Sequence, residues 1–383
     1  MFDYSQALRK GEWLEIPLSA LALTGSESKG AAVPAGLSNP DEGAVQSEPE
    51  SRPDEEVGPS EAGSDEREGA APLGAGSHPH EVRQRLLALS LFPAKWINRL
   101  FSVGGIRLEG ETVRLLAFPA ANPAADPLYR QAAEALRELK RREEKPGSNG
   151  RPDKSGSLKA AGAAIVPILY QDDYCMVLDK PAGMPVHASF PGQRGTLDEA
   201  AALHCLLAGD PLPVRHVHRL DEDTSGPVLY TKNDLSQLRL DEEMRHKRID
   251  RQYIALVEGI PARSRGTVRA PIGKDRHHRS RRRVHPGGDE AVTHYEVAER
   301  FAAAALLRLR LETGRTHQIR VHMSHLGHPL IGDTLYGGSA GLLGHQALHG
   351  EKIIFTHPLS GDRMEIVSPV PEWFEAVRSR LKG

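Results

Sequence analysis

The sequence of 383 residues predicts an α+β fold around a mixed, mostly antiparallel central sheet, with a small separate unit before it. From residue 165 onward, short apolar runs bounded by turn residues alternate with helical patterns, and no regular strand–helix–strand repeat is present. Residues 143–162 are rich in Gly, Ser, Lys and Pro, which is the composition of a flexible linker. Two folded parts joined by a linker are therefore expected.

The chain divides by composition into five segments. They are 1–22, a short strand segment; 23–80, a disordered acidic insert; 81–120, a compact module; 121–162, a charged helix and linker; and 163–383, the main α+β domain. The insert contains almost no large apolar residues, so it cannot bury enough surface to offset its ordering entropy. The compact module is expected to hold two short helices and a glycine-bounded turn and strand at 104–110, with basic residues on one face. Those basic residues are Arg83, Arg85, Lys95, Arg99 and Arg107.

The main domain shows alternating strand and helix signals in order. Strands are expected at 165–169, 175–178, 227–231, 253–257, 292–297, 306–311, 353–355 and 364–367, and helices at 197–207, 234–246, 315–325 and 371–381. Asn233 or Asp234 is expected to cap the second of these helices, since a short polar side chain accepts from the first-turn amides.

Charge and composition restrict the class of protein. Residues 25–80 carry 12 acidic residues against three basic ones, a net charge of −9, which leaves +7 for the rest of a chain whose net charge is −2. A basic folded part favours a polyanionic partner such as nucleic acid. The two cysteines, Cys175 and Cys205, form no disulfide framework and suit a reducing cytoplasm. No apolar stretch is long enough to span a membrane, and no secretory signal is expected at the N-terminus.

One stretch, residues 216–226, concentrates charge beside an apolar strand and has three interpretations. It is a solvated loop with a salt-bridged aspartate, or a metal site, or a reactive centre. The metal interpretation uses imidazole and carboxylate ligands, His216, His218, Asp221 and Asp223. The reactive interpretation makes Asp221 a nucleophile or base and Arg219 a contact to phosphate or base. This stretch alone does not decide among them.

A second stretch, residues 311–322, places polar residues where a strand ends at Gly314 and a helix follows. Thr316 is the expected helix cap, and Arg315 adds positive charge at a helix N-terminus, which attracts phosphate. Arg320 lies between apolar neighbours, so its guanidinium is expected to be partly buried and to need a carboxylate, for which Asp221 is the candidate. The histidines that follow, His322, His325 and His328, are expected to cap or face solvent rather than bind metal.

A third stretch, residues 274–283, is a basic loop between two strands. It contains six Lys or Arg residues and two histidines, with almost no apolar anchor, so a phosphate backbone is its natural partner. The alternative is a solvated run of charge. Tyr253, in a nearby strand, is either a core residue or a ring on which a base stacks.

The ordered set of motifs resembles the RluA-type (RluA/RluD family) RNA pseudouridine synthases. The motifs are His218-Arg219-Leu220-Asp221, Thr224-Ser225-Gly226, Gly314-Arg315-Thr316-His317-Gln318-Ile319-Arg320-Val321-His322, Leu178-Asp179-Lys180-Pro181-Ala182-Gly183 and the glycine-rich run from Gly327 through Gly332-Asp333 to Tyr336-Gly337. The resemblance covers about residues 163–376. It departs from the family at Arg251, two residues before Tyr253, where the family commonly has Lys.

The resemblance implies isomerisation of uridine to pseudouridine in structured RNA, without metal or other cofactor. Asp221 is implied as the essential carboxylate, and Arg219 as the residue that fills the gap left by an extruded nucleotide. Tyr253, Arg320 and Ile319 are implied to bind the substrate. The residues implied to bind RNA are Lys180, Lys274, Arg276, Arg281, Arg282, Arg283 and Arg315.

The same resemblance indicates the partners. Large-subunit ribosomal RNA is the expected substrate, with transfer RNA as the second candidate, for a monomeric cytoplasmic enzyme without a membrane partner. Residues 81–120 resemble an S4 RNA-binding module, with Glu109 where that module often has Asn. Two competing functions stay open: a non-catalytic RNA-binding or assembly protein, and a metal-dependent hydrolase using His216, His218 and Asp221.

Overall fold

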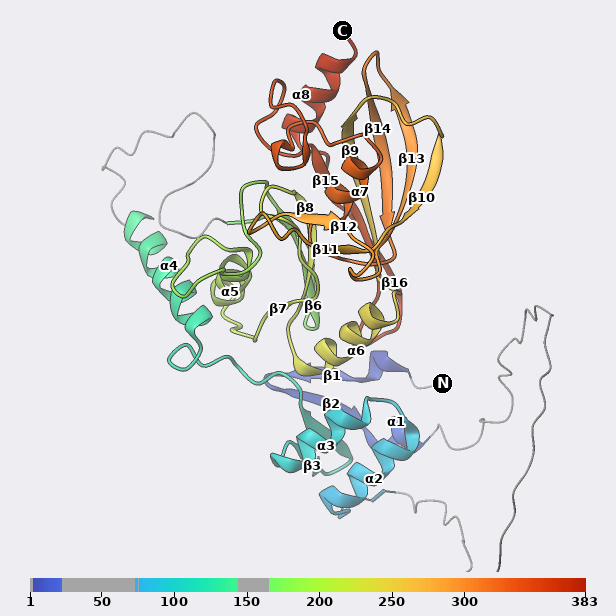
Figure 1. Ribbon diagram of the computed structural model, residues 1–383. Coiled ribbons are helices and arrows are strands. Elements are labelled where there is room, and N and C mark those ends of the chain that lie inside the picture. Colours follow the sequence, from blue (N-terminus) through green and yellow to red (C-terminus); the bar gives the residue numbers. More distant parts are fainter. Residues whose placement is uncertain (1–2, 23–72, 75, 144–164) are drawn as a thin grey trace, which may run out of the picture.

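The computed structural model describes residues 3–22, 73–74, 76–143 and 165–383, and Figure 1 shows how their elements are arranged. Most of the predicted acidic insert, 23–80, and most of the predicted linker lie outside these ranges. The insert prediction fails at its C-terminal end, because helix α2 begins at Pro79. A Pro at the first helical position and a capping box made by His78 and Glu81 fix that start.

The N-terminal unit contains both residues 1–22 and the predicted module 81–120, which the sequence analysis had assigned to separate segments. Its four-stranded antiparallel sheet has the order β1 (Leu8–Lys10), β2 (Trp13–Pro17), β4 (Thr112–Leu116) and β3 (Ile106–Glu109), with α1 (Leu18–Ala22), α2 (Pro79–Leu89) and α3 (Ala94–Ser102) packed against it. Strands β2 and β4 pair with Ile16 opposite Val113, and both side chains are fully buried. Residues 1–22 are therefore part of the same sheet as residues 106–116. A strand as short as 13–17 gains stability only from such pairing.

The N-terminal unit is docked against the rest of the chain (Figure 1). Its hydrophobic core includes Tyr174 and Leu359 from the main domain. Arg9 joins the two parts by ion pairs of 2.7 Å to Asp173 and 2.6 Å to Asp210. An apolar core that crosses the junction gives the two parts a fixed relative position.

Helix α4 (Pro127–Glu143) belongs with the main domain and is not a charged helix that leads only to a linker. Tyr129, Ala132 and Ala135 are buried in the same cluster as Ala201 and Leu203 of α5 (Leu197–Leu207). These three residues form the buried face of α4. The sequence analysis overlooked this face because two of the three residues are alanines, which contribute little to an apolar pattern.

The main domain is built on two antiparallel sheets (Figure 1). The six-stranded sheet has the order β10 (Arg265–Arg269), β13 (Val292–Arg300), β14 (Ala304–Leu311), β9 (Asp250–Glu258), β15 (Leu348–Thr356) and β16 (Arg363–Val367). The four-stranded sheet has the order β5 (Ile168–Gln171), β6 (Cys175–Lys180), β8 (Gly226–Thr231) and β7 (Arg215–His216). A two-stranded hairpin, β11 (Ile272–Lys274) and β12 (Arg282–Val284), lies beside them. The named strand pairs are all antiparallel, as most of the predicted sheet was expected to be. The parallel pairing in the described residues is one isolated bridge, between Ser225 and His349.

The remaining helices cover these sheets. They are α6 (Asp234–Arg245), α7 (Gln318–His325), the 3-10 turn η3 (Thr334–Tyr336) and α8 (Glu372–Leu381). Asn233 caps α6 as predicted, accepting from the amide of Ser236 at 2.8 Å. The prediction that Thr316 caps the next helix is wrong, because α7 starts at Gln318 and its N-cap is His317 in a left-handed conformation, with φ of 57°.

The two main sheets meet where β8 begins. Gly226 has a φ of +126°, and a Cβ there would lie 2.4 Å from the carbonyl oxygen of Gly350 in β15. Only glycine allows this approach. The contact fixes the loop that precedes β8, residues 217–225, against β15 of the six-stranded sheet.

Candidate active site

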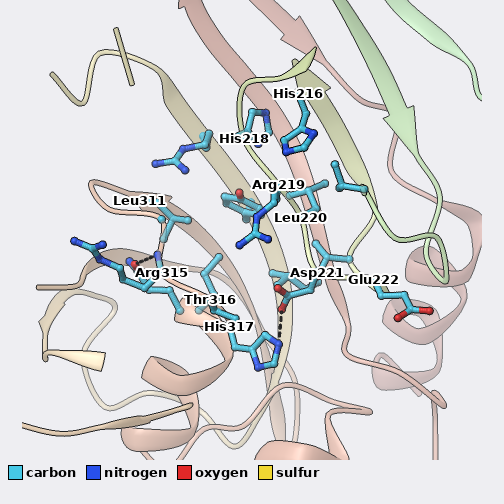
Figure 2. A pocket seen from close by; sticks show the side chains of 18 of the residues that line it. His216, His218, Arg219, Leu220, Asp221, Glu222, Leu311, Arg315, Thr316 and His317 are labelled. Atoms are coloured by element: carbon cyan, nitrogen blue, oxygen red, sulfur yellow. Dashed lines mark hydrogen bonds and ion pairs between the residues drawn. The ribbon is translucent and has the colours of Figure 1, made fainter. Parts of the chain in front are cut away.

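A groove of about 640 Å³ lies between the loop 217–225 and the start of α7. The loop before α5 and the strands β9, β14 and β15 complete its walls. Figure 2 shows Asp221 and His317 directed toward each other across it, with Arg219 and Leu220 from the same loop as Asp221. The groove therefore joins the two charged stretches that lie about a hundred residues apart in the sequence.

Asp221 and Arg320 form the ion pair that the apolar neighbours of Arg320 predicted. Nη1 of Arg320 lies 3.1 Å from Oδ2 of Asp221. The same guanidinium donates to Asp333 through Nε at 2.6 Å and Nη2 at 2.8 Å. Burial lowers the pKa of Arg320, but its hydrogen bonds and the charges of Asp333 and Asp221 outweigh burial, and the pKa is raised overall. Among the described residues, Oδ1 of Asp221 has no hydrogen-bond partner, so this oxygen is available to a ligand in the groove.

Lys180 holds the loop that carries Asp221. Its ammonium donates to the carbonyl oxygens of Glu222 and Met184 at 2.6 Å and of Pro181 at 2.9 Å. The side chain is 0% exposed, and burial lowers its pKa to about 7 against the raising effect of nearby Asp223, Asp221 and Glu222. Its three donors are occupied by carbonyls. The prediction that Lys180 contacts RNA phosphate is therefore wrong, and the residue is structural.

His317 is fixed beside Asp221 by the 3-10 turn η3. Its Nδ1 lies 2.9 Å from the hydroxyl of Tyr336, which also accepts from the backbone amide of Arg282 at 2.9 Å. Its Nε2 lies 4.0 Å from Oδ2 of Asp221. Burial and the charge of Arg320 lower the pKa of His317, although Asp221 opposes them. A neutral imidazole with one nitrogen toward the groove is the result.

The other residues predicted to bind the substrate also line the groove. Tyr253 and Ile319 are 6% and 4% exposed, so each is a core residue with one edge at the groove. Burial raises the pKa of Tyr253, with Asp221 adding to the rise and Arg251 opposing it. Arg219 is exposed, and its Nη1 lies 3.3 Å from Nε2 of His187. Its side chain is thus free of any carboxylate among the described residues.

The basic stretch 274–283 forms the hairpin of β11 and β12 rather than an unanchored loop. Ile272 and Val284 pack into a small cluster with Tyr336, and the guanidinium of Arg281 lies 5.6 Å from the ring centre of Tyr336. The hairpin is therefore attached to the residue that holds His317. Lys274, Arg276, Arg281 and Arg283 are exposed, and Arg282 is half-buried. Arg315 is exposed at the groove, where its Nε donates to the carbonyl of Glu290 at 3.0 Å.

Each of the two histidines in the metal interpretation has one ring nitrogen engaged in another contact. Nδ1 of His216 lies 2.9 Å from Asp198, and Nε2 of His218 accepts from the amide of Leu229 at 3.2 Å. Burial, together with the charges of Arg251 and His216, lowers the pKa of His218 to about 3, so this imidazole is neutral. The nitrogens of His322 contact the hydroxyl of Thr293 at 2.8 Å and the carbonyl of Ala270 at 2.9 Å.

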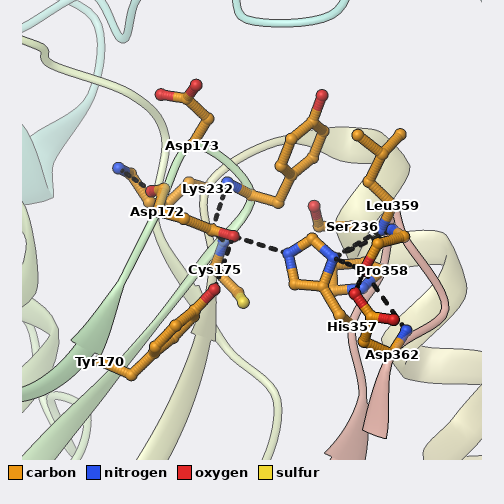
Figure 3. Close-up of polar contacts among 12 residues, drawn as sticks. Tyr170, Asp172, Asp173, Cys175, Lys232, Ser236, His357, Pro358, Leu359 and Asp362 are labelled. Atoms are coloured by element: carbon orange, nitrogen blue, oxygen red, sulfur yellow. Dashed lines mark hydrogen bonds and ion pairs between the residues drawn. The ribbon is translucent and has the colours of Figure 1, made fainter. Parts of the chain in front are cut away.

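In the described part of the chain, one group of possible metal ligands does come together, at Asp172, Cys175 and His357 (Figure 3). However, Nδ1 of His357 accepts from the amide of Ser360 at 3.0 Å, so the ring proton is on Nε2, which donates to Asp172 at 2.6 Å. A protonated nitrogen has no lone pair for a metal. This group is a hydrogen-bond network that ties β6 to the chain after β15.

Comparison with known proteins decides the family. A family model described as RNA pseudouridylate synthase matches residues 173–325. The RNA pseudouridine synthase YhcT of Bacillus subtilis, described as uncharacterized, is 46% identical over 206 residues, which cover 53% of this chain and 68% of that protein. The chain belongs to the RNA pseudouridylate synthase family. It is thus an RNA pseudouridine synthase with an α+β catalytic domain, and its substrate is RNA, as the motifs predicted.

The comparisons also found a second relative and a solved structure. The ribosomal large subunit pseudouridine synthase D of Xanthomonas campestris pv. campestris is 44% identical over 236 residues, covering 56% of this chain and 69% of that protein. The solved structure of human RNA pseudouridylate synthase domain containing 4 has a TM-score of 0.48 at 23% identity, covering 66% of this chain and 97% of that one. In the described part of this pseudouridine synthase, no helix is long and apolar enough to cross a membrane.

Sequence reasoning missed the roles of four residues of the site. Asp333, His317 and Tyr336 belong to motifs that carry the resemblance, but nothing in those motifs indicates what each side chain contacts. Arg251 stands out in the sequence only as a departure from the family pattern. The sequence predicted a carboxylate partner for Arg320 and gave Asp221 as the candidate, but it did not indicate that Asp333 is a second partner.

Proposed function

We propose that Asp221 is the essential carboxylate of the isomerisation and acts on the ribose of a uridine extruded into the groove. The observation that supports this role is its free Oδ1, held at the groove by the Oδ2 contact to Arg320. In the reaction the bond from N1 of uracil to the ribose breaks, the uracil turns, and its C5 joins the ribose. C5 then loses a proton and N1 gains one, so uridine and product have the same composition and no co-substrate is consumed.

Three other residues support this proposal by their positions. Arg219 is the exposed cation beside Asp221 and fills the gap in the RNA stack when the uridine leaves it. Tyr253 presents a ring edge at the groove floor for contact with the uracil, and Ile319 packs beside it. A groove of about 640 Å³ is in the range of volumes that accept a ligand of nucleotide size.

The proposed substrate is large-subunit ribosomal RNA. The name of the Xanthomonas relative, at 44% identity, supports this choice. The test maps pseudouridines in ribosomal and transfer RNA from cells that lack the protein and from cells that express Asp221→Asn. Asp223→Asn is the matched control, because Asp223 is in the same loop but does not line the groove.

The expected result is loss of one or more pseudouridines from large-subunit ribosomal RNA, restored by the wild type and by Asp223→Asn but not by Asp221→Asn. Loss only from transfer RNA would overturn the proposed substrate. Full restoration by Asp221→Asn would overturn the role of Asp221. Activity that a chelator abolishes would favour a metal-dependent reaction instead.

We also propose that the N-terminal unit is an S4-like RNA-binding module, and that α4 together with residues 165–383 forms the catalytic domain. Two helices followed by the β3–β4 hairpin support the S4-like arrangement. Lys95 and Arg107 are exposed on it, whereas Arg99 pairs with Asp234 of the main domain at 2.9 Å. Lys95→Glu with Arg107→Glu should weaken RNA binding more than Lys10→Glu, since Lys10 is already paired with Glu15 at 2.7 Å. Equal effects of the two changes on RNA affinity would count against the module.

A further inference from the structure

Arg251 is a buried cation without a partner at the groove. It lies in β9, two residues before Tyr253, and is 9% exposed. Its Nε is buried and has no hydrogen-bond partner, and no carboxylate among the described residues lies within 4.0 Å of its guanidinium. It nevertheless lines the groove together with Asp221 and Arg219.

The other buried cations of the site are fully compensated. Arg320 has two carboxylates, Asp221 and Asp333, and Lys180 has three carbonyl oxygens. Burying a guanidinium without such partners is costly, because the protein does not replace the hydration that the charge loses. A negative group that enters the groove would supply the missing partner.

The neighbour of Arg251 on this wall is a neutral imidazole, which supplies no negative charge. Nε2 of His218 accepts from the amide of Leu229, so its proton is on Nδ1, which is buried and lies against the backbone of Arg219. His218 and Arg251 line the groove together. The guanidinium of Arg251 is therefore the uncompensated positive group on this wall, which is what an anion site requires.

Gly314 gives the guanidinium room. A Cβ at position 314 would lie 2.6 Å from Nη1 of Arg251, closer than real Cβ contacts come. The side chain therefore lies against the bare backbone where β14 ends, next to exposed Arg315. A larger residue at 314 would displace the guanidinium, which is the flexible end of its side chain, while leaving its charge in place.

We propose that Arg251 binds a backbone phosphate next to the extruded uridine. This inference rests on the proposed function. Phosphates are the anionic groups of RNA, and a uridine cannot enter the groove without bringing its flanking phosphates toward it. The planar fork of a guanidinium matches two oxygens of a phosphate, which a lysine ammonium does not. This proposed site differs from the exposed cations of the β11–β12 hairpin. Arg251 lines the groove that would receive the extruded nucleotide, whereas the hairpin cations do not line it.

The test uses an RNA oligonucleotide that spans the uridine identified by the mapping experiment. Each phosphate flanking that uridine is replaced in turn by an uncharged methylphosphonate, and affinity is measured with wild type, Arg251→Gln, Arg251→Lys and Gly314→Ala. One of the replacements should weaken wild-type binding about tenfold, but should change binding by Arg251→Gln less than about twofold. The slope of log affinity against log salt should fall by about 0.7 for Arg251→Gln and stay unchanged for Arg251→Lys.

Two of these variants retain the positive charge at position 251 and so distinguish loss of the phosphate contact from a folding defect. Arg251→Lys and Gly314→Ala should lose part of the response to the same methylphosphonate while keeping the wild-type melting temperature. If the methylphosphonate weakened binding by Arg251→Gln and Gly314→Ala as much as binding by the wild type, the inference would be overturned. Arg251 would then have a structural role or contact the uracil. Pseudouridine formation by the wild type, measured on the same oligonucleotide, reports on the proposed function separately. An active enzyme without coupling to Arg251 overturns only the phosphate site.

Discussion

Nη1 of Arg320 lies 3.1 Å from the carboxylate of Asp221, while Nε and Nη2 of the same guanidinium are held by both oxygens of Asp333. Asp333 is 2% exposed, so it never serves a ligand directly. It orients Arg320, and Arg320 in turn orients Asp221. Asp333 thus holds the guanidinium, while Asp221 keeps one oxygen free for the role in the reaction that we propose for it.

Replacing Asp333 should therefore damage both stability and turnover. Asp333→Asn leaves a buried guanidinium with one carboxylate, and the loss is expected to be about 3 kcal/mol of unfolding free energy. The turnover number should fall more than the Michaelis constant changes, since Asp221 loses its orientation. The control is Asp289→Asn, because Asp289 is 3.8 Å from exposed Arg315 and should change the stability by less than about 1 kcal/mol. Denaturant unfolding measures the change in stability, and steady-state kinetics measures the change in turnover. Equal effects of Asp333→Asn and Asp289→Asn would contradict the role of Asp333 in orienting Arg320.

Lys180 should behave as a structural residue and not as an RNA contact. Lys180→Met removes the donor from three carbonyls, of which only that of Glu222 keeps another donor, the amide of Gly183, so a destabilisation of about 2 kcal/mol is expected. Because these carbonyls belong to the segments that hold Asp221, turnover should fall as well. The salt dependence of RNA binding should keep the wild-type slope. A flatter slope would restore the phosphate role that the sequence predicted.

The exposed cations of the β11–β12 hairpin should control the salt dependence instead. Replacing Arg281, Arg282 and Arg283 by Gln should flatten the slope of log affinity against log salt by about 2, since each lost phosphate contact removes about 0.7 to 0.9. Arg380→Gln, at an exposed position near the end of α8, is the control and should leave the slope unchanged. Fluorescence anisotropy between low and high salt measures these slopes. An unchanged slope in the triple variant would remove the hairpin from the RNA interface.

Asp172 should make the junction between β6 and His357 sensitive to acid. Burial raises its pKa, but the hydrogen bond from His357 and those from the amides of Cys175 and Tyr174 outweigh burial and lower the pKa to about 2. Its unfolded value is 3.8, so its contribution of about 2 kcal/mol is complete above pH 4 and is lost as the pH falls toward 2. Asp172→Asn should destabilise the protein at pH 7 and matter little near pH 2. A constant difference at both pH values, measured by denaturant unfolding, would contradict this linkage.

The sequence predicted those parts of the site that one motif contains. Asp221 stood out because carboxylates are rare beside a buried strand, and Arg320 because its neighbours Ile319 and Val321 are apolar. The prediction for Lys180 was wrong because a lysine beside Pro181 and Gly183 has the local pattern of an exposed loop. Its burial depends on carbonyls that only the fold brings together.

The fold was predicted where a single segment carries its own signal. The helix at 197–207 has its apolar residues and its cap within one stretch, and its predicted bounds are those of α5. The N-terminal unit was divided wrongly because β2 pairs with β4, about a hundred residues later in the chain. Pairing between distant strands depends on register and packing, which a composition pattern does not contain.

His349 should make the contact between the loop 217–225 and β15 a second acid-sensitive point. Its Nδ1 lies 2.9 Å from the hydroxyl of Ser225, four residues after Asp221, and burial lowers its pKa to about 4, although a hydrogen bond from the imidazole to the backbone of Ser368 opposes this. The unfolded chain takes up this proton near pH 6.5 and the folded chain only near pH 4, so protons favour unfolding between these values. Stability from this residue is complete above pH 6.5 and falls by about 3 kcal/mol as the pH drops to 4. His349→Asn, which keeps a polar group toward Ser225 but does not titrate, should flatten the pH dependence of the melting temperature between pH 6.5 and 4. His285→Asn, on an exposed turn after β12, is the control, and an equally steep profile in His349→Asn would show that other groups set the acid limit of the fold.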